Sequence, residues 1–390
     1  MNLEKKKIKV LNVITLFSVG GATETVVSMA DGLIKKGYDV HIATGPNNPA
    51  EGSMYETTEK LGIPVYTFTN LKRAINVFND LKIIYELTRF IKINKYDIVH
   101  THSSKAGVVG RVASFLAGTP IRIHTIHGLP FHRYEPWYIK YSFMLIEKVT
   151  ALISTKIVAV THTIVNVMVK NHLAKKNKFV VIRSGFDVKE YTDFNHDVSY
   201  LKEKYNIANN DFVIGKVARF SILKGHIFLL EAFKIVSEKI PNAKLLLIGN
   251  GELENELKQK VNEMNLDDRV IFTGLIQPEE IPATISLLDV LVHTSLLEGL
   301  ARVLPQAIML AKPVISFDLD GAPEVIKDGY NGYLIEPENI EMLANRIINL
   351  ALNPDKAKKF GIAGKEFLKD EFCSKKMVDE IDKLYKSMLK

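Results

Sequence analysis

The most constraining feature of this sequence is an alternation of short runs rich in valine and isoleucine with longer stretches of helical periodicity. Apolar runs at 9–15 and 38–44 enclose the stretch 23–37, whose apolar residues recur at helical spacing and which ends on two lysines and Gly37. Strand–helix–strand units of this kind predict a mostly parallel sheet with helices on both faces.

The alternation forms a first series, lapses, and starts again. The first series continues with expected strands at 97–102, 121–128, 156–162 and 179–182, and expected helices at 105–118 and 163–173. A polar linker is expected at 188–210, with a short helix around Tyr200. The second series has expected strands at 212–220, 243–249, 269–274, 289–295 and 312–317, and expected helices at 226–240, 339–352, 354–372 and 375–389.

The two series predict two doubly wound, Rossmann-like α/β domains that face each other across a cleft. We expect the first over 1–187 and the second over 211–373, with ligands binding at the carboxyl ends of the strands. A chain of 390 residues fits two such domains.

Composition excludes several other classes of protein. No window reaches the ~18 uninterrupted apolar residues that a membrane span requires, and the apolar run near the start reads as a first strand rather than a signal peptide. The single cysteine, Cys373, rules out an intramolecular disulfide and favours a cytoplasmic protein. The net charge of +7 is concentrated at 5–9 and 170–178, without the interleaved aromatics that a nucleic-acid groove would offer, so we expect no nucleic-acid partner.

Two sets of residues could bind phosphate. Gly20 and Gly21 stand between the first strand and its helix, where they either admit a phosphate to the backbone amides or only make a tight turn. Arg219 and Lys224 stand between a strand and a helix of the second domain, and two cations at such a place suit a diphosphate. Gly249 and its neighbours lack the third glycine of a dinucleotide motif, so a nicotinamide site is not expected.

Histidines and aspartates raise the question of a metal. Five histidines crowd the end of the first domain: His100, His102, His124, His127 and His132. We expect His100 and His102 to project from opposite faces of their strand, and therefore predict no metal site there. Asp318 and Asp320 are interpreted as part of a shaped loop rather than as a cation-binding motif.

Glu298 stands beside Gly299, between an apolar strand and a stretch of helical spacing. A helix that begins near Gly299 would direct its amides at the cleft, provided that Pro305 lies in the first turn. There Glu298 could accept hydroxyl hydrogen bonds from a sugar, and Gln306 could reach a neighbouring group. The alternative is an acid that only complements the helix dipole.

Together these stretches resemble the retaining glycosyltransferases of family 4, the "glycosyl transferases group 1" set with the GT-B fold. The matching stretches follow one another along nearly the whole chain, at 20–44, 98–118, 124–132, 217–233, 245–257 and 296–325. The stretches around His102 and His127 are particularly similar to bacterial members that build surface polysaccharides and glycolipids.

The resemblance implies roles for particular residues. Gly20 and Gly21 would approach the donor phosphates, His127 would contact the donor sugar, and Arg219 and Lys224 would bind the diphosphate. Glu298 matches the first acid of the family's Glu-x7-Glu motif, which touches the transferred sugar, whereas Gln306 occupies the place of the second acid, which receives the ribose hydroxyls. Further donor-binding residues would be Gly249, Gly274, Leu275, Gly299, Leu300 and Ala301.

The resemblance also implies the reaction and its partners. A sugar would pass, with retention and without a metal or cofactor, from a nucleotide-diphosphate sugar, by analogy a UDP-sugar, to a hydroxyl of a glycan or lipid-linked acceptor. The last helix, 374–390, would cross back onto the first domain. Two alternatives remain: a sugar-nucleotide epimerase on the same fold, and a non-catalytic subunit that keeps the fold.

A separate hypothesis concerns an anionic membrane surface. In the stretch 135–149, Trp137, Tyr138, Tyr141 and Phe143 accompany two lysines, a pattern that suits lipid headgroups as well as packing inside the protein. Docking there would place the protein peripherally on the inner face of the cell membrane.

Overall fold

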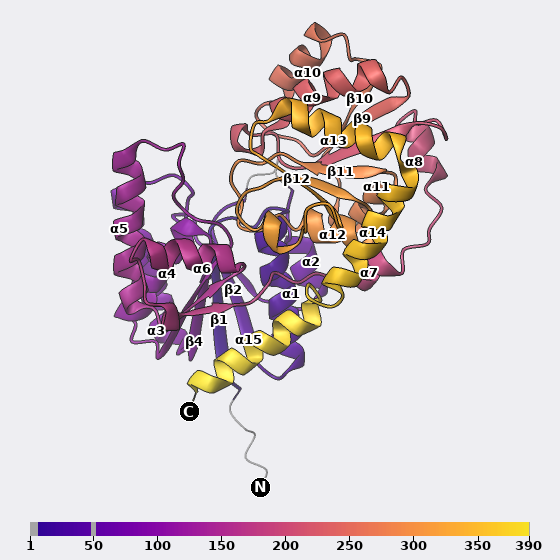
Figure 1. Ribbon diagram of the computed structural model, residues 1–390. Coiled ribbons are helices and arrows are strands. Elements are labelled where there is room, and N and C mark those ends of the chain that lie inside the picture. The colour runs from indigo at the N-terminus through magenta and orange to yellow at the C-terminus, as the bar shows by residue number, and fades with distance from the viewer. Residues whose placement is uncertain (1–6, 48–51, 390) are drawn as a thin grey trace. The chain divides into compact units, whose positions relative to one another are not determined.

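The chain folds into two compact α/β units. A computed structural model describes residues 7–47 and 52–389 (Figure 1). Unit 1 comprises Met1–Phe186 and Phe372–Lys390, and unit 2 comprises Asp187–Glu371. Each is described by itself below. Lys5 and Lys6 of the basic run at 5–9 lie outside the described residues.

Unit 1 is built on a parallel sheet of seven strands in the order β3-β2-β1-β4-β5-β6-β7. Its strands are β1 (Lys9–Ile14), β2 (Asp39–Thr44), β3 (Val65–Thr67), β4 (Ile98–His102), β5 (Ile121–Ile126), β6 (Lys156–Ala159) and β7 (Phe179–Val181). Its helices are α1 (Gly21–Lys35), α2 (Tyr55–Lys60), α3 (Val77–Asn94), α4 (Ser104–Leu116), α5 (Trp137–Ile153), α6 (His162–Lys170) and α15 (Ser374–Met388). The central strands are buried and rich in valine and isoleucine, because helices cover them on both faces.

The last helix of the chain belongs to unit 1, as expected. Helix α15 packs on α1 and buries Met377, Ile381 and Tyr385 in the core of unit 1 (Figure 1). Two buried hydrogen bonds fix it there. The hydroxyl of Tyr385 lies 2.7 Å from Nδ1 of His100, and the hydroxyl of Tyr38 donates to Oδ1 of Asp382 at 2.7 Å.

Replacing Tyr385 by phenylalanine is expected to destabilise unit 1 by about 1–3 kcal/mol, because it leaves Nδ1 of the buried His100 without its hydrogen bond. The matched control is Tyr200→Phe, which removes the hydroxyl of an exposed tyrosine. Urea unfolding of both variants measures the difference, and equal midpoints would show that the bond contributes no net stability.

Unit 2 is built on a second parallel sheet, with six strands in the order β10-β9-β8-β11-β12-β13. Its strands are β8 (Phe212–Val217), β9 (Ala243–Ile248), β10 (Val270–Gly274), β11 (Val290–His293), β12 (Val314–Phe317) and β13 (Gly332–Ile335). Its α-helices are α7 (Lys189–Thr192), α8 (Ser199–Lys204), α9 (His226–Lys239), α10 (Glu254–Glu263), α11 (Ile281–Ser286), α12 (Val303–Met309), α13 (Ile340–Leu352) and α14 (Pro354–Leu368). The sequence pattern does not identify β13, because a strand of four residues is too short to show the alternation of buried and exposed side chains.

The stretch at 188–210 differs from the expected linker. It lies wholly in unit 2 and carries α7 and α8, and α7 contacts α12. The short helix expected around Tyr200 is α8. The polar composition reflects the exposed faces of two short helices, which bury only Tyr191 and Leu201.

Within the described residues, no helix combines the length and the apolarity needed to cross a bilayer.

Candidate functional site

The strand order of unit 2 reverses between β8 and β11, and loops from these two strands carry the main candidate residues. In open parallel sheets, the loops at the carboxyl ends of the two strands that flank such a reversal diverge and leave room for a ligand. Lys224 lies in the loop after β8 and Glu298 in the loop after β11. The topology therefore explains why residues 74 positions apart meet.

Lys224 and Glu298 form a direct ion pair. Nζ of Lys224 donates to Oε1 of Glu298 at 2.5 Å, and Nε2 of His293, at the end of β11, lies 3.5 Å from the same oxygen. Burial alone would raise the pKa of Glu298, but Lys224 and His293 outweigh it and hold this pKa well below its usual range. Glu298 is therefore ionised at neutral pH, and it can accept hydrogen bonds but not donate a proton.

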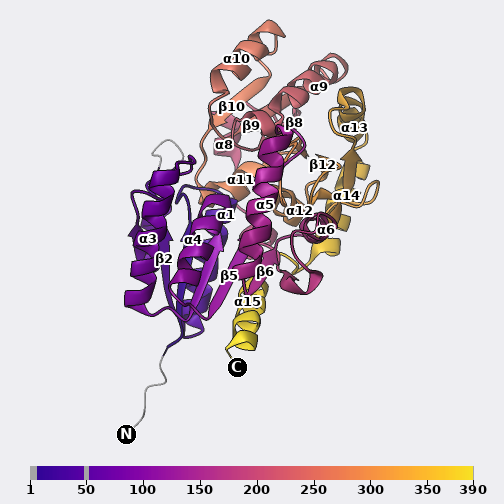
Figure 2. The same cartoon turned by 90° about the vertical axis from the view of Figure 1, so that its left-hand side faces the viewer.

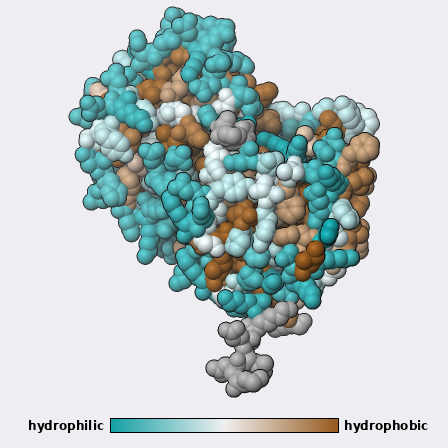
Figure 3. Space-filling model, turned by 180° about the vertical axis from the view of Figure 1, so that it is seen from behind, coloured by the Kyte–Doolittle hydropathy of each residue, from teal (hydrophilic) through white to brown (hydrophobic). Residues whose placement is uncertain are grey.

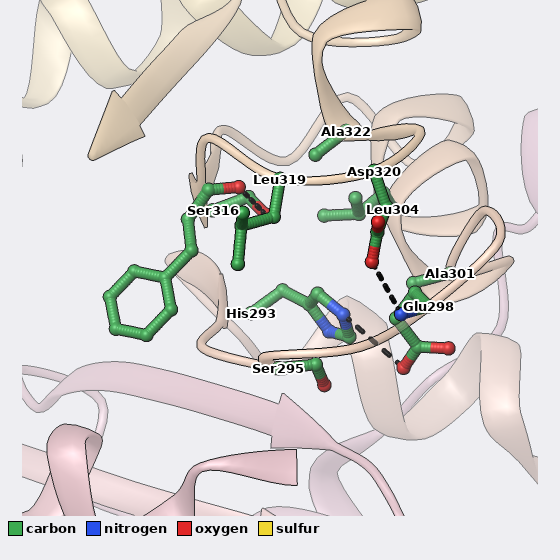
Figure 4. Close-up of a pocket in the computed structure, with 10 residues that line it drawn as sticks. His293, Ser295, Glu298, Ala301, Leu304, Ser316, Leu319, Asp320 and Ala322 are labelled. Carbon is green, nitrogen blue, oxygen red and sulfur yellow. Dashed lines mark hydrogen bonds and ion pairs between the residues drawn. The ribbon is translucent and has the colours of Figure 1, made fainter. Parts of the chain in front are cut away.

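Asp320 fixes the backbone at Glu298. Its Oδ2 accepts a hydrogen bond from the backbone nitrogen of Glu298 at 2.6 Å (Figure 4). Asp320 itself has φ 51°, a left-handed conformation that aspartate tolerates better than most residues. The interpretation of the Asp318–Asp320 stretch as a shaped loop fits this geometry, but the contact with Glu298 was not foreseen.

A small hollow lies beside this pair, with Glu298 in its wall. Figure 4 shows the backbone nitrogen of Glu298 directed at Asp320 and its carboxylate beside His293. The hollow is lined by His293, Ser295, Glu298, Ala301, Leu304, Ser316, Phe317, Leu319, Asp320 and Ala322. Its wall thus combines two carboxylates and two hydroxyls, which can hydrogen-bond to hydroxyl groups, with apolar carbon.

The helix after Glu298 starts later than expected. Helix α12 begins at Val303, not near Gly299, and has only seven residues. Pro305 explains the shift, because proline is tolerated in the first turn of a helix and a start at Gly299 would put it in the second. The segment from Gly299 to Ala301 is therefore a loop, and no helix end is directed from Gly299. Gln306 lies buried in α12 and does not line the hollow.

Arg219 follows β8 and pairs with Glu252. Nη2 of Arg219 lies 3.3 Å from Oε2 of Glu252, and the side chain is partly exposed. The backbone of Gly249 passes close to this segment: a Cβ on Gly249 would lie 2.4 Å from the oxygen of Ala218, so only glycine fits.

The remaining candidates of unit 2 lie in neighbouring loops. The backbone nitrogen of Gly249 donates to the oxygen of Gly274 at 3.1 Å, which joins the ends of β9 and β10. Leu275 follows Gly274 and is exposed, and Leu300 is half-buried in the loop before α12.

The sequence pattern does not identify a buried lysine that lies close to the ion pair. Lys216, within β8, is fully buried, and its Nζ donates to Oγ1 of Thr294 at 3.0 Å. Thr294 in turn donates to the oxygen of Gly225 at 2.7 Å, immediately after Lys224. Gly225 has φ 62°, and a Cβ there would lie 2.1 Å from the oxygen of Thr294. This chain of contacts fixes the backbone that presents Lys224, although a lysine within a strand gives no signal of burial in a sequence.

The stability of the protein should depend on the ionisation of Lys216. Burial, and then the Lys224 ammonium, lower the pKa of Lys216 from 10.5 to about 7. Between these values the unfolded chain binds more protons than the folded one, so stability rises with pH by up to about 1.4 kcal/mol per pH unit. Lys216→Met should lack this rise and be more stable than the wild type at pH 7.

Urea unfolding at pH 7, 8 and 9 checks this dependence. Every other titrating group is common to both proteins, so the difference between the two stability curves isolates Lys216. Parallel curves would contradict the assignment.

In unit 1 the sheet order reverses between β1 and β4, and the candidates again follow strands near this point. Gly20 precedes α1 and Gly21 is its first residue, two positions before the expected start. A Cβ on Gly20 would meet nothing within 4 Å, so the space above this turn is open. His127 follows β5 directly and is half-buried.

His127 rests on a second histidine. Nε2 of His127 lies 3.1 Å from Nδ1 of His102, and Nε2 of His102 lies 3.3 Å from Oδ1 of Asn12. Burial and the neighbouring rings of His100, His127 and His124 hold the pKa of His102 well below its usual range, so His102 is neutral. A neutral imidazole between these two groups orients the ring of His127.

The expectation that His100 and His102 project from opposite faces is wrong. Their rings stack with centroids 4.4 Å apart, because residues two positions apart on a strand lie on the same face. His100 is buried between Tyr385 and Thr125, and burial lowers its pKa to about 3. Across residues 7–47 and 52–389, no group of three or more histidine, cysteine, aspartate or glutamate side chains is arranged to hold a metal ion.

Comparison with known proteins matches each half of the chain to a family of glycosyltransferases. Residues 19–190 match the family "Glycosyltransferase Family 4", and residues 197–367 match the family "Glycosyl transferases group 1". These matches cover each unit separately and follow one another along the chain.

Two curated relatives are similar along most of their length. The chain is 27% identical to the UDP-Gal:alpha-D-GlcNAc-diphosphoundecaprenol alpha-1,3-galactosyltransferase of Escherichia coli, over 90% of this chain and 89% of that protein. It is 29% identical to the capsular polysaccharide biosynthesis glycosyltransferase CapM of Staphylococcus aureus, over 92% of each. Among solved structures, Anabaena HepE in complex with UDP and glucose has the same fold, with a TM-score of 0.85 at 23% identity, covering 97% of this chain and all of that one.

Proposed function

Since the chain belongs to the family 4 glycosyltransferases, with the two-domain GT-B fold, we propose that it transfers a sugar from a UDP-sugar to a hydroxyl of a lipid-linked or capsular glycan. The observation that carries the proposal is the ion pair of Lys224 and Glu298 beside the hollow of unit 2. Glycosyl transfer itself follows from the family. The donor, the acceptor and the stereochemistry are parts of the proposal.

Lys224 and Arg219 neutralise the diphosphate as it leaves. When the anomeric bond breaks, negative charge grows on the departing oxygen, and cationic donors that are already in place stabilise it without reorganisation. We propose that these two side chains, with backbone amides near Gly20 and Gly21, supply this stabilisation without a metal. Gly249, Gly274 and Leu275 lie in the neighbouring loops and shape the nucleotide site.

Glu298 and His127 hold the transferred sugar. An ionised Glu298 accepts hydrogen bonds from sugar hydroxyls, and its contact with Asp320 fixes the position from which it does so. Leu300 and Ala301 continue this wall, and Gln306 replaces an acid in the ribose contact. The acceptor hydroxyl attacks from the face that the diphosphate leaves and passes its proton to the leaving phosphate, so the anomeric configuration is retained.

The epimerase alternative fits the site less well. An epimerase would need acids poised to exchange protons, but Glu298 is held ionised by Lys224 and the sequence has glutamine at Gln306. The non-catalytic alternative is disfavoured because Arg219, Lys224, His127 and Glu298 are all present.

The test is transfer from a panel of radiolabelled UDP-sugars to a polyprenyl-diphosphate-linked N-acetylglucosamine, with and without a chelator. We expect one donor to give a labelled lipid in both conditions, and NMR of the product to show the anomeric configuration of the donor. Isomerised nucleotide sugar in the absence of acceptor would establish the epimerase instead. An inverted linkage or loss of activity with chelator would overturn retention or metal independence, respectively.

A further inference from the structure

Helix α5 in unit 1 presents its apolar side to solvent. Trp137 at its start is 73% exposed and Leu152 near its end is 75% exposed. Seven large apolar side chains of this helix are exposed in all: Trp137, Tyr138, Tyr141, Leu145, Ile146, Val149 and Leu152. The sequence alone leaves open whether the aromatic residues of this stretch meet lipid or pack inside the protein. In the structure Phe143 is half-buried, whereas Trp137, Tyr138 and Tyr141 are exposed.

The buried side of α5 is narrow and includes a charge: only Met144, Glu147, Thr150 and Ala151 are buried. Glu147 is buried against α4, where its Oε1 accepts from Nη2 of Arg111 at 2.9 Å. Thr150 is buried beside it. An amphipathic helix on a globular protein ordinarily does the reverse, with its apolar stripe toward the core and its charges toward water. The ion pair with Arg111 therefore holds α5 in an orientation that leaves its apolar stripe uncovered.

Helix α3 adds a second exposed apolar ridge. Its exposed residues include Val77, Phe78, Leu81, Tyr85 and Ile93, and Phe78 is 85% exposed. Helix α4 packs against both α3 and α5 and lies between them (Figure 2). Figure 3 shows apolar side chains along the right-hand edge of unit 1, on the side where α5 lies. We call the exposed residues of α3 and α5 the α3/α5 face.

The charges of the α3/α5 face are all positive. The exposed positions of the two helices include Lys82, Arg89, Lys92 and Lys148, and none of them is an acid. The acids of the two helices are engaged elsewhere: Asp80 pairs with Lys105, Glu86 accepts from Asn70, and Glu147 is buried. None of the four exposed basic side chains forms an ion pair within the described structure.

We propose that the α3/α5 face docks on the surface of an anionic phospholipid bilayer. Apolar side chains enter the boundary between headgroups and acyl chains, tyrosine and tryptophan favour that boundary, and lysine and arginine bind lipid phosphates. A second copy of the chain suits this face less well, because a symmetric contact would oppose its positive charges to one another. The proposal uses no residue of the donor site and would deliver the protein to a lipid-linked acceptor.

The single tryptophan of the chain offers a direct probe. Trp137 is the only tryptophan and lies on the α3/α5 face. We expect its fluorescence emission to shift to shorter wavelength when vesicles of phosphatidylcholine and phosphatidylglycerol are added. Vesicles of phosphatidylcholine alone should give a smaller shift, and added salt should weaken the binding to the anionic vesicles. The absence of any shift with anionic vesicles would overturn the proposal.

Vesicle flotation of surface variants tests which residues bind. Leu145→Ser with Leu152→Ser should weaken binding by roughly tenfold or more, since each leucine contributes buried apolar area. The matched control is Leu352→Ser with Ile362→Ser, which removes two exposed apolar side chains from unit 2 and should leave binding unchanged. Lys82→Glu with Lys148→Glu should abolish the preference for anionic vesicles, whereas Lys358→Glu with Lys359→Glu on α14 should preserve it.

Two further measurements separate the outcomes. UDP binding by the α3/α5 variants should equal that of the wild type, so failure of the proposed donor chemistry would leave the membrane result standing. Sedimentation of the wild type in the absence of lipid should show a monomer. A dimer that dissociates in the Leu145→Ser/Leu152→Ser variant would assign the face to a second copy and overturn membrane docking.

Discussion

Replacing Lys224 by alanine is expected to lower kcat/KM for sugar transfer by roughly a hundred- to a thousandfold, the effect typical of losing one donor that stabilises a developing negative charge. The loss has a second cause, because Glu298 would keep its charge without the ammonium that now neutralises it at 2.5 Å. Arg219→Ala should also lower turnover, but only because it removes a cation that binds the diphosphate. Lys224→Arg should retain part of the activity, since it keeps the charge but not the compact geometry.

The matched control for Lys224→Ala is Lys260→Ala, which removes a lysine that pairs with Glu263 on the exposed side of α10. Steady-state rates with saturating acceptor and varied donor measure all four variants. The urea midpoints of the variants must be compared as well, so that lost activity is not confused with lost folding. Wild-type rates in both Lys224→Ala and Arg219→Ala would refute the assignment of the diphosphate site.

Replacing Glu147 by leucine is expected to destabilise unit 1 by about 3–5 kcal/mol, because it leaves the guanidinium of Arg111 buried without a counter-charge. Nη1 of Arg111 and Oε2 of Glu147 already lack hydrogen bonds, so the pair is only partly satisfied. Replacing both residues together, by Arg111→Met and Glu147→Leu, should therefore cost far less than either single change.

A double-mutant cycle in urea measures this coupling. The exposed pair of Lys260 and Glu263 is the contrast, and breaking it should cost within about 1 kcal/mol. Additive effects of Arg111→Met and Glu147→Leu would show that the two residues are not coupled. The Arg111–Glu147 pair also orients α5, so loss of the pair should affect vesicle binding even where the fold survives.

Much of the fold could be predicted from local patterns. The first βαβ unit shows its strands as apolar runs and its helix as a stripe that ends on lysines and Gly37, and the structure places β1, α1 and β2 there. Short or exposed elements could not be found in this way. β13 has four residues, and α3 mixes exposed apolar residues with the buried ones, so its apolar stripe is blurred.

The candidate site was predictable where a residue type suits its chemistry and lies at a strand end. Lys224 and Glu298 satisfy both conditions, and their contact followed from the strand order. The roles of Lys216 and Asp320 could not be predicted, because they depend on tertiary contacts with Thr294 and Glu298. Helix α12 starts at Val303 rather than near Gly299, because Pro305 is tolerated only in the first turn of a helix.

Calorimetric titration of UDP and of uridine shows whether Lys224 binds the diphosphate of the donor rather than its nucleoside. We expect the wild type to bind UDP much more tightly than uridine, and Lys224→Ala to lose at least roughly tenfold in UDP affinity while its uridine affinity is unchanged. Equal UDP affinity in the two proteins, or an equal loss for both ligands, would contradict it.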